Sequence, residues 1–167
     1  MDKQNYYENL KAKMEEEVKQ SEYMVQVHHR LTELYQERLE IYKTNNFSKP
    51  EYIEIFKEIV GSYEIIFEDN FNKATKLSKK ISKKEAFINS IDEDDLLMDI
   101  EDDFQLDNDR DELDNIFSDM ESDVENLQEE LQQIKDMRLL SREEALSLSS
   151  KIKKLENIKD KVENMCY

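Results

Sequence analysis

Apolar residues recur at helical spacing along most of this chain. Between residues 7 and 42 they recur at helical spacing, which predicts a first amphipathic helix. Ser48 and Glu51 then have the spacing of a capping box, and a proline is favourable in the first turn of a helix. We therefore expect a second helix from about Pro50 to about Asn89.

The second half of the chain has the more regular pattern. One heptad position holds Leu113, Met120, Leu127 and Ile134, and another holds Phe117, Val124 and Leu131. This spacing predicts a third helix with coiled-coil-like packing. Residues 107–109 precede this helix and are of types that favour caps and turns, so the helical pattern of the acidic segment should break or restart there. A second capping box, Ser141 with Glu144, predicts a last helix to about residue 165.

Four helices joined by short connections should be antiparallel neighbours. The expected fold class is all-α, an elongated antiparallel helical bundle with coiled-coil-like packing. We expect a single domain over residues 1–167, made of a helical hairpin at 3–90 and an acidic segment with a second hairpin at 92–165. A single glycine and a single proline leave too little turn chemistry for a β-sheet.

The second helix carries the broadest apolar face. Eleven of the twenty residues from Tyr52 to Phe71 are apolar, which is typical of a central, buried helix. Gly61 lies within this stretch, where a glycine favours the close approach of another helix. Ile55 and Phe67 are our candidates for an apolar interface with a second copy of the chain.

The negative charge of the chain comes from one segment. Residues 92–130 contain nineteen Asp and Glu and a single Arg, whereas the remainder of the chain has 22 acidic and 23 basic residues. A field of one sign concentrated on one element is typical of a recognition surface.

Six lysines lie between residues 73 and 84 without an intervening acid. Such a run alone resembles a membrane-surface or nucleic-acid patch. An antiparallel turn centred near Ile91 would place Lys84 opposite Met98 and Lys80 opposite Asp102, so we favour internal neutralisation by the acidic segment. Whether the run binds something outside the molecule is left open.

No catalytic, cofactor or metal site is predicted. An aspartate spacing like that of an EF-hand begins at Asp107, but the sixth and twelfth positions lack the required Gly and Glu. His28 and His29 are adjacent and point about 100° apart on a helix, so they cannot share a metal. We therefore expect no enzyme. Without a signal peptide or a long apolar run, the expected location is cytoplasmic, with no membrane contact.

Eight carboxylates of the third helix lie outside its heptad seam, and we expect them to coat its solvent side. They are Glu112, Asp114, Asp119, Glu121, Asp123, Glu125, Glu129 and Glu130. Over the whole acidic segment the charge spacing is about 3 Å along a helix, close to the ~3.4 Å of one DNA strand, which permits nucleic-acid mimicry.

Two functions are compatible with these patterns. We favour a non-enzymatic interaction module whose acidic helix docks on a basic surface of a partner protein, inhibiting or escorting a nucleic-acid-binding protein without binding nucleic acid itself. The alternative is a structural coiled-coil spacer or assembly subunit, homo-oligomeric through the apolar face around Tyr52–Phe71.

Overall fold

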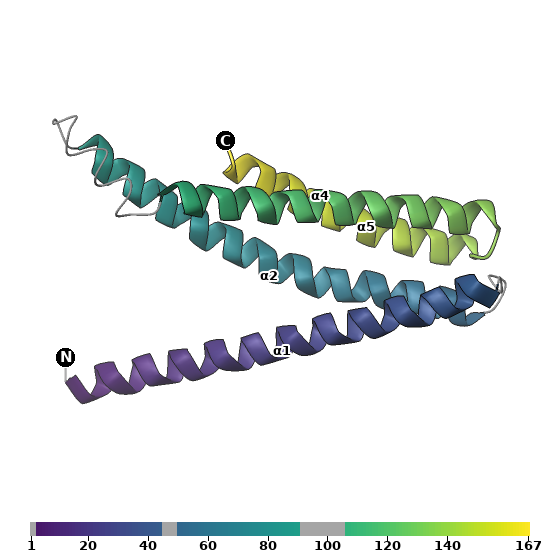
Figure 1. Cartoon of the computed structure of the whole chain (residues 1–167), viewed down its shortest axis with the longest axis horizontal. Helices are drawn as coiled ribbons and strands as arrows, with labels where there is room; N and C mark the ends of the chain where they lie inside the picture. Colours follow the sequence, from purple (N-terminus) through teal and green to yellow (C-terminus); the bar gives the residue numbers. More distant parts are fainter. Residues whose placement is uncertain (1–2, 45–49, 91–105) are drawn as a thin grey trace. The chain divides into compact units, whose positions relative to one another are not determined.

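A computed structural model of the chain describes residues 3–44, 50–90 and 106–167. These residues form four helices and no strand: α1 (Lys3–Thr44), α2 (Pro50–Asn89), α4 (Leu106–Asp136) and α5 (Arg142–Met165) (Figure 1). The all-α class is confirmed, and α2 has the bounds that its sequence pattern predicted. None of the helices in these ranges is long and apolar enough to cross a membrane.

The chain divides into two compact units, Met1–Ser62 and Tyr63–Tyr167. The division falls inside α2, directly after Gly61 and Ser62, so this helix contributes to both units. The sequence pattern predicted a single domain made of two hairpins, 3–90 and 92–165, and this stays a prediction.

The first unit is a hairpin of α1 and residues 50–62 of α2. The Tyr42 and Tyr52 hydroxyls lie 3.1 Å apart, and Arg30 donates two hydrogen bonds of 2.9 and 3.0 Å to the Glu58 carboxylate. The two helices therefore run antiparallel. Their buried side chains come from the second half of α1 and from the start of α2, and include Met24, Val27, Leu31, Leu34, Ile41, Tyr52, Phe56 and Ile59.

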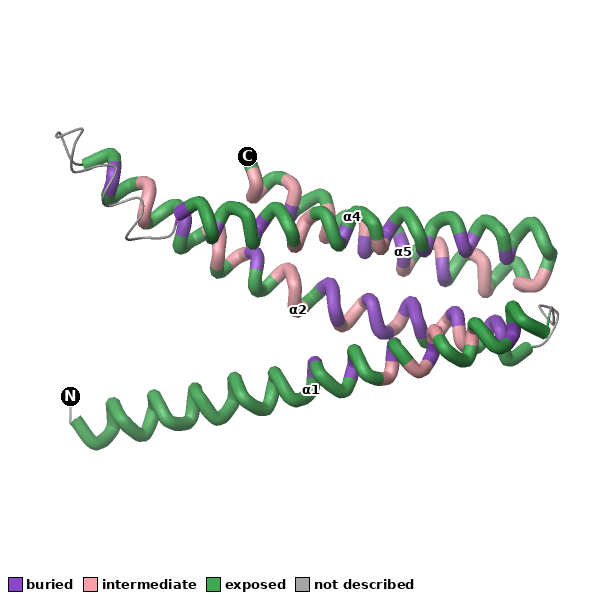
Figure 2. Tube along the Cα trace, in the orientation of Figure 1, coloured by how far each residue is buried: buried purple, intermediate pink, exposed green. Residues whose placement is uncertain are grey.

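The first half of α1 has a different environment. Every residue from Lys3 to Tyr23 is exposed, and the buried positions of the helix begin at Met24. Figure 2 shows this half of α1 exposed along its whole length. A helix of 42 residues is about 63 Å long, so roughly half of that length has no cover in its own unit.

In the second unit, α4 and α5 lie side by side and run antiparallel (Figure 1). Lys135 near the end of α4 donates a hydrogen bond of 3.0 Å to Ser149 near the start of α5. The capping box at the start of α5 is confirmed, because Ser141 accepts from the amide of Glu144 while the Glu144 side chain accepts from the amide of Ser141. The predicted heptad seam is buried at Leu113, Met120, Val124, Leu127, Leu131 and Ile134 and half-buried at Phe117.

Residues 63–89 of α2 complete this unit. Lys84 of α2 lies 2.7 Å from Asp109 at the start of α4, and Glu64 of α2 lies 3.8 Å from Lys151 of α5. Since the end of α2 is level with the start of α4, these two helices are antiparallel. The second unit is thus a three-helix arrangement around apolar side chains from all three helices.

Gly61 does not mark a close approach between helices. A Cβ atom added at this position would have no neighbouring heavy atom within 4 Å. The expectation from sequence is therefore wrong here, because the surrounding side chains leave open space above the glycine.

Candidate functional site

The acidic residues predicted on α4 fall into two groups. The first group is exposed and consists of Glu112, Asp114, Asp119, Glu121, Glu125 and Glu129. In the described ranges, no ion pair joins these residues to a Lys or Arg side chain. These six carboxylates form the acidic surface of α4, which is our candidate interaction surface.

The other two predicted residues are not on the solvent side. Glu130 is only 8% exposed, and Asp123 is half-buried. Both follow Asp109 at multiples of seven residues, so they lie on the side of α4 where Asp109 meets α2. The prediction of a solvent position is wrong for them because it considered only the α4 seam, whereas α4 also has α2 as a neighbour.

Burial changes the acidity of Asp123. Partial removal from water raises the pKa of this carboxyl to about 6, and the nearby negative charge of Asp119 adds to the effect. Near pH 6, Asp123 is therefore about half protonated.

Two lysines of the run on α2 contact α4 at Asp109. Its carboxylate, with a side chain only 9% exposed, lies 2.7 Å from Nζ of Lys84 and 3.4 Å from Nζ of Lys80. The hydrogen bond from Lys84, with the charge of Lys80, holds the pKa of Asp109 below its ordinary value. The aspartate that resembled an EF-hand ligand is therefore engaged by two ammonium groups.

Internal neutralisation is thus confirmed for Lys80 and Lys84, although the expected register is wrong. The register assumed a tight turn near Ile91 and put Lys80 opposite Asp102, which lies outside the described residues, as does Met98. In the structure, both lysines lie beside Asp109 instead.

The remaining lysines of the run do not converge on α4. Lys73 pairs with Asp69 of its own helix at 3.2 Å. Lys76, Lys79 and Lys83 are exposed, and none of them forms an ion pair with an acidic residue in the described ranges. Their availability to another molecule stays open.

The two residues proposed for an apolar interface have little free surface. Phe67 has no exposed area, and Ile55 is half-buried. A second copy could reach Ile55 but not Phe67 without rearrangement of the helix packing. Contact with a second copy through this face stays a prediction.

The exposed apolar residues at the start of α1 were not singled out from the sequence. Tyr7, Leu10, Met14 and Val18 repeat at helical spacing, but the next apolar residue of the pattern comes six positions later, at Met24. A step of six interrupts the spacing of three or four residues. That break was the available signal.

The described residues contain no group of three or more His, Cys, Asp or Glu side chains arranged for a metal ion. His29 lies 2.9 Å from Glu33 in an ordinary pair one helical turn apart. Burial, with Asp114 nearby, raises the pKa of the Cys166 thiol to about 11, so this thiol is poorly nucleophilic at neutral pH. No protein-family model, curated protein or solved structure matches the chain.

Proposed function

We propose that this protein is a non-enzymatic interaction module and that the acidic surface of α4 binds a basic surface of a partner protein. The observation that carries the proposal is that α4 packs with one side and exposes its carboxylates on the other. Its apolar side is buried against the rest of its unit, while its six exposed carboxylates lack an ion-pair partner within the described ranges. The helix is therefore held rigidly with its charge facing outward.

Such a surface favours fast, salt-dependent association. Charges of one sign on a fixed element raise the rate of encounter with a basic partner, and the attraction falls as salt shortens the Debye length to a few ångströms. The partner we propose is a nucleic-acid-binding protein that is inhibited or escorted while its basic surface is covered, because residues 92–130 concentrate nineteen carboxylates and a single Arg in the sequence.

Affinity capture from an extract of the source cells tests the proposal. The immobilised full chain should retain one or a few basic proteins at roughly 50 mM salt and release them at roughly 500 mM, where exposed charges are screened. A variant neutralised at four outward positions should retain none of them, with helicity by circular dichroism unchanged. Its substitutions are Glu112→Gln, Asp119→Asn, Glu125→Gln and Glu129→Gln.

A matched control separates position from total charge. Neutralising four exposed glutamates away from α4 removes the same charge and should leave capture intact. These are Glu40, Glu51, Glu54 and Glu68. Equal loss in both variants would mean that only net charge matters, and capture that resists high salt would contradict the acidic surface altogether.

Competition tests the nucleic-acid part of the proposal. The captured protein, loaded with a labelled oligonucleotide, should release it as the full chain is added. A ternary complex containing protein, partner and oligonucleotide would show that the basic surface used is not the nucleic-acid site.

A further inference from the structure

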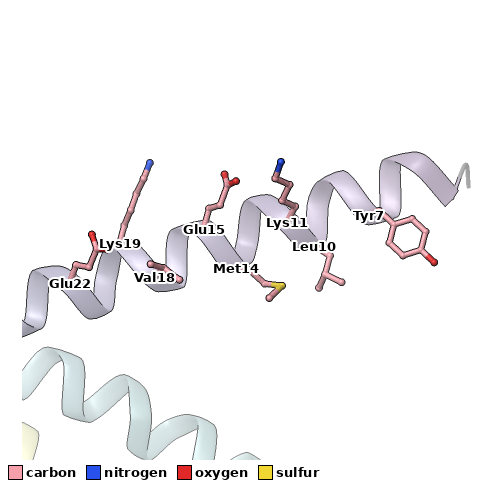
Figure 3. A pocket seen from close by; sticks show the side chains of 8 residues that line it. All are labelled: Tyr7, Leu10, Lys11, Met14, Glu15, Val18, Lys19 and Glu22. Atoms are coloured by element: carbon pink, nitrogen blue, oxygen red, sulfur yellow. The ribbon is translucent and has the colours of Figure 1, made fainter.

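The second unit contains a cavity where the end of α2 lies beside the start of α4. Its volume is about 320 Å³, close to the lower end of the roughly 300–1,000 Å³ that small-molecule sites occupy. Residues of α2, of α4 and of the end of α5 line it. The open pocket beside Leu10 and Met14 differs, because its lining belongs to α1 alone and nothing in the structure shows what covers it (Figure 3). A cavity lined by three helices can hold a small ligand from several sides.

The buried part of the lining is apolar. Ile81 of α2 and Leu113 of α4 are 8% and 2% exposed, and Met165 of α5 is half-buried. Because Ile81 and Leu113 belong to the packed core of the unit, this part of the cavity has a fixed shape. A ligand with an apolar body therefore gains free energy by removing that body from water here.

Most of the remaining lining is polar. Ser78 and Ser82 of α2 and Asn164 of α5 provide hydroxyl and amide oxygens, which accept hydrogen bonds. These groups suit a ligand that carries several N–H donors at one end.

Three charged side chains line the cavity, and two of them neutralise each other. Arg110 donates a hydrogen bond of 2.6 Å from Nη2 to Oε1 of Glu85. The third is Asp114, which forms no ion pair with a Lys or Arg side chain within residues 3–44, 50–90 and 106–167. The lining therefore has a net negative charge, and that charge lies on Asp114.

The Cys166 thiol, which also lines the cavity, is affected by the same negative charge. Burial, the hydrogen bond with Asp114 and the charges of Asp114 and Glu163 raise the pKa of this thiol to about 11. A thiol is only a weak hydrogen-bond donor. An ammonium group would be a stronger partner for the Asp114 carboxylate, because hydrogen bonds between ionised groups are roughly twice as strong as those between neutral groups.

An anionic ligand fits this lining less well. It would compete with the Glu85 carboxylate for Arg110, whose Nη1 also lies 3.7 Å from the Asp107 carboxylate. The negative charge of Asp114 would oppose it as well. The lining thus selects for a positive charge.

We propose that this cavity binds a small primary amine with an apolar body. The ammonium group donates to the Asp114 carboxylate and to the neighbouring hydroxyl and amide oxygens, and the apolar body lies against Ile81, Leu113 and Met165. This activity goes beyond the proposed docking on a basic protein, since the ligand enters a cavity of the second unit and needs no partner protein.

Calorimetric titration of the full chain with phenethylamine tests the proposal. The dissociation constant should be on the order of 100 µM, because a ligand with about nine non-hydrogen atoms has little surface to bury. Phenethyl alcohol keeps the aromatic body and replaces the ammonium group by a hydroxyl, so it should bind about tenfold more weakly. Hydrocinnamate, which carries a carboxylate instead, should not bind.

A pair of variants tests the role of Asp114. Asp114→Asn should weaken the binding of phenethylamine about tenfold and leave that of phenethyl alcohol unchanged. Glu112→Gln is the matched control, because it removes the same charge from an exposed position of α4 that does not line the cavity. It should bind phenethylamine like the wild type. Both variants should keep their helicity by circular dichroism, since both positions are exposed.

Blocking and mapping experiments test the location. Ser82→Trp places a large side chain at an exposed position of the lining and should abolish the binding of both the amine and the alcohol. In methyl NMR spectra of the wild type, phenethylamine should shift the signal of Met165 and leave that of Met24, in the first unit, unchanged.

Four results would overturn the proposal. Absence of binding up to about 10 mM phenethylamine would exclude the site at the expected affinity. Equal affinity for the amine and the alcohol would show that the ammonium group plays no part. Equal losses in Asp114→Asn and Glu112→Gln would mean that only net charge matters. A shift at Met24 without one at Met165 would place the ligand outside the cavity.

Discussion

Helices α1 and α4 have similar apolar patterns and opposite environments. On α4 the heptad positions are buried, as Met120 with no exposed area illustrates, and on the first half of α1 the equivalent positions are open to solvent, as Met14 illustrates. Their charges also differ. The exposed side of α4 is strongly acidic, whereas the start of α1 is nearly neutral. A helix whose apolar side is already covered can offer only charge to a partner, whereas one with an open apolar side can offer packing.

This contrast shows what each helix has available for a contact. Exposed carboxylates favour a basic partner and depend on salt, while exposed apolar side chains favour packing, which salt affects little. The two are expected to respond to different mutations and different solution conditions. The following predictions test the packing difference on which this comparison depends.

The largest expected effect comes from truncating equivalent methionines. Met120→Ala should lower the free energy of unfolding by about 3 kcal/mol, because it leaves a cavity in a packed core. Met14→Ala should change it by less than about 0.5 kcal/mol, because the Met14 side chain is exposed. Urea denaturation measures both. Equal losses would mean that Met14 is buried in solution.

The next largest effect concerns the carboxylate that joins α2 to α4. Asp109→Ala should cost about 2 kcal/mol at pH 7, because it removes the 2.7 Å ion pair with Lys84, whose side chain is only 16% exposed. Asp107→Ala removes a nearby carboxylate that is 95% exposed and should cost less than about 0.5 kcal/mol.

The pH dependence gives a second check on Asp109. Its pKa is lowered in the folded chain, so its stabilising contribution is present above the unfolded value of 3.8 and is lost as pH falls through the lower folded value. The stability difference between wild type and Asp109→Ala should therefore shrink in strong acid. A difference that does not change with pH would argue against the ion pair.

A smaller effect is expected at Asp123. Its pKa is raised from 3.8 to about 6, so the folded chain holds a proton between these pH values that the unfolded chain has released. Ionised Asp123 therefore costs stability as pH rises from about 4 to about 6, and Asp123→Asn should stabilise the protein by about 1 kcal/mol at pH 7.5, a value reduced because water still reaches the side chain. At pH 4 the gain should vanish.

The smallest effect is expected on α2, the helix that both units share. Gly61→Ala should stabilise the protein by about 0.5 to 1 kcal/mol, because alanine restricts the unfolded chain and its Cβ meets no neighbour. Thermal unfolding measures the change. A loss of stability would show that another segment approaches this position in solution.

Local sequence patterns were sufficient to predict the helices. Capping at Ser141, the apolar spacing of α2 and the seven-residue repeat of α4 each depend on residues within a few turns of one another, and the predicted helices appear in the structure with nearly the expected bounds. Six of the eight acidic positions could also be placed on the solvent side, because a helix with one known seam has a predictable opposite side.

Relations between distant segments were decided by the tertiary structure alone. Asp123 and Glu130 lie outside the α4 seam and are nevertheless half-buried and buried, and Lys80 and Lys84 of α2 meet Asp109, which follows them by 29 and 25 residues. The sequence determined that α1 and α4 each have an apolar side. Which of those sides the chain covers depends on how helices far apart in sequence dock, since apolar surface is attracted to any apolar surface without regard to its position along the chain.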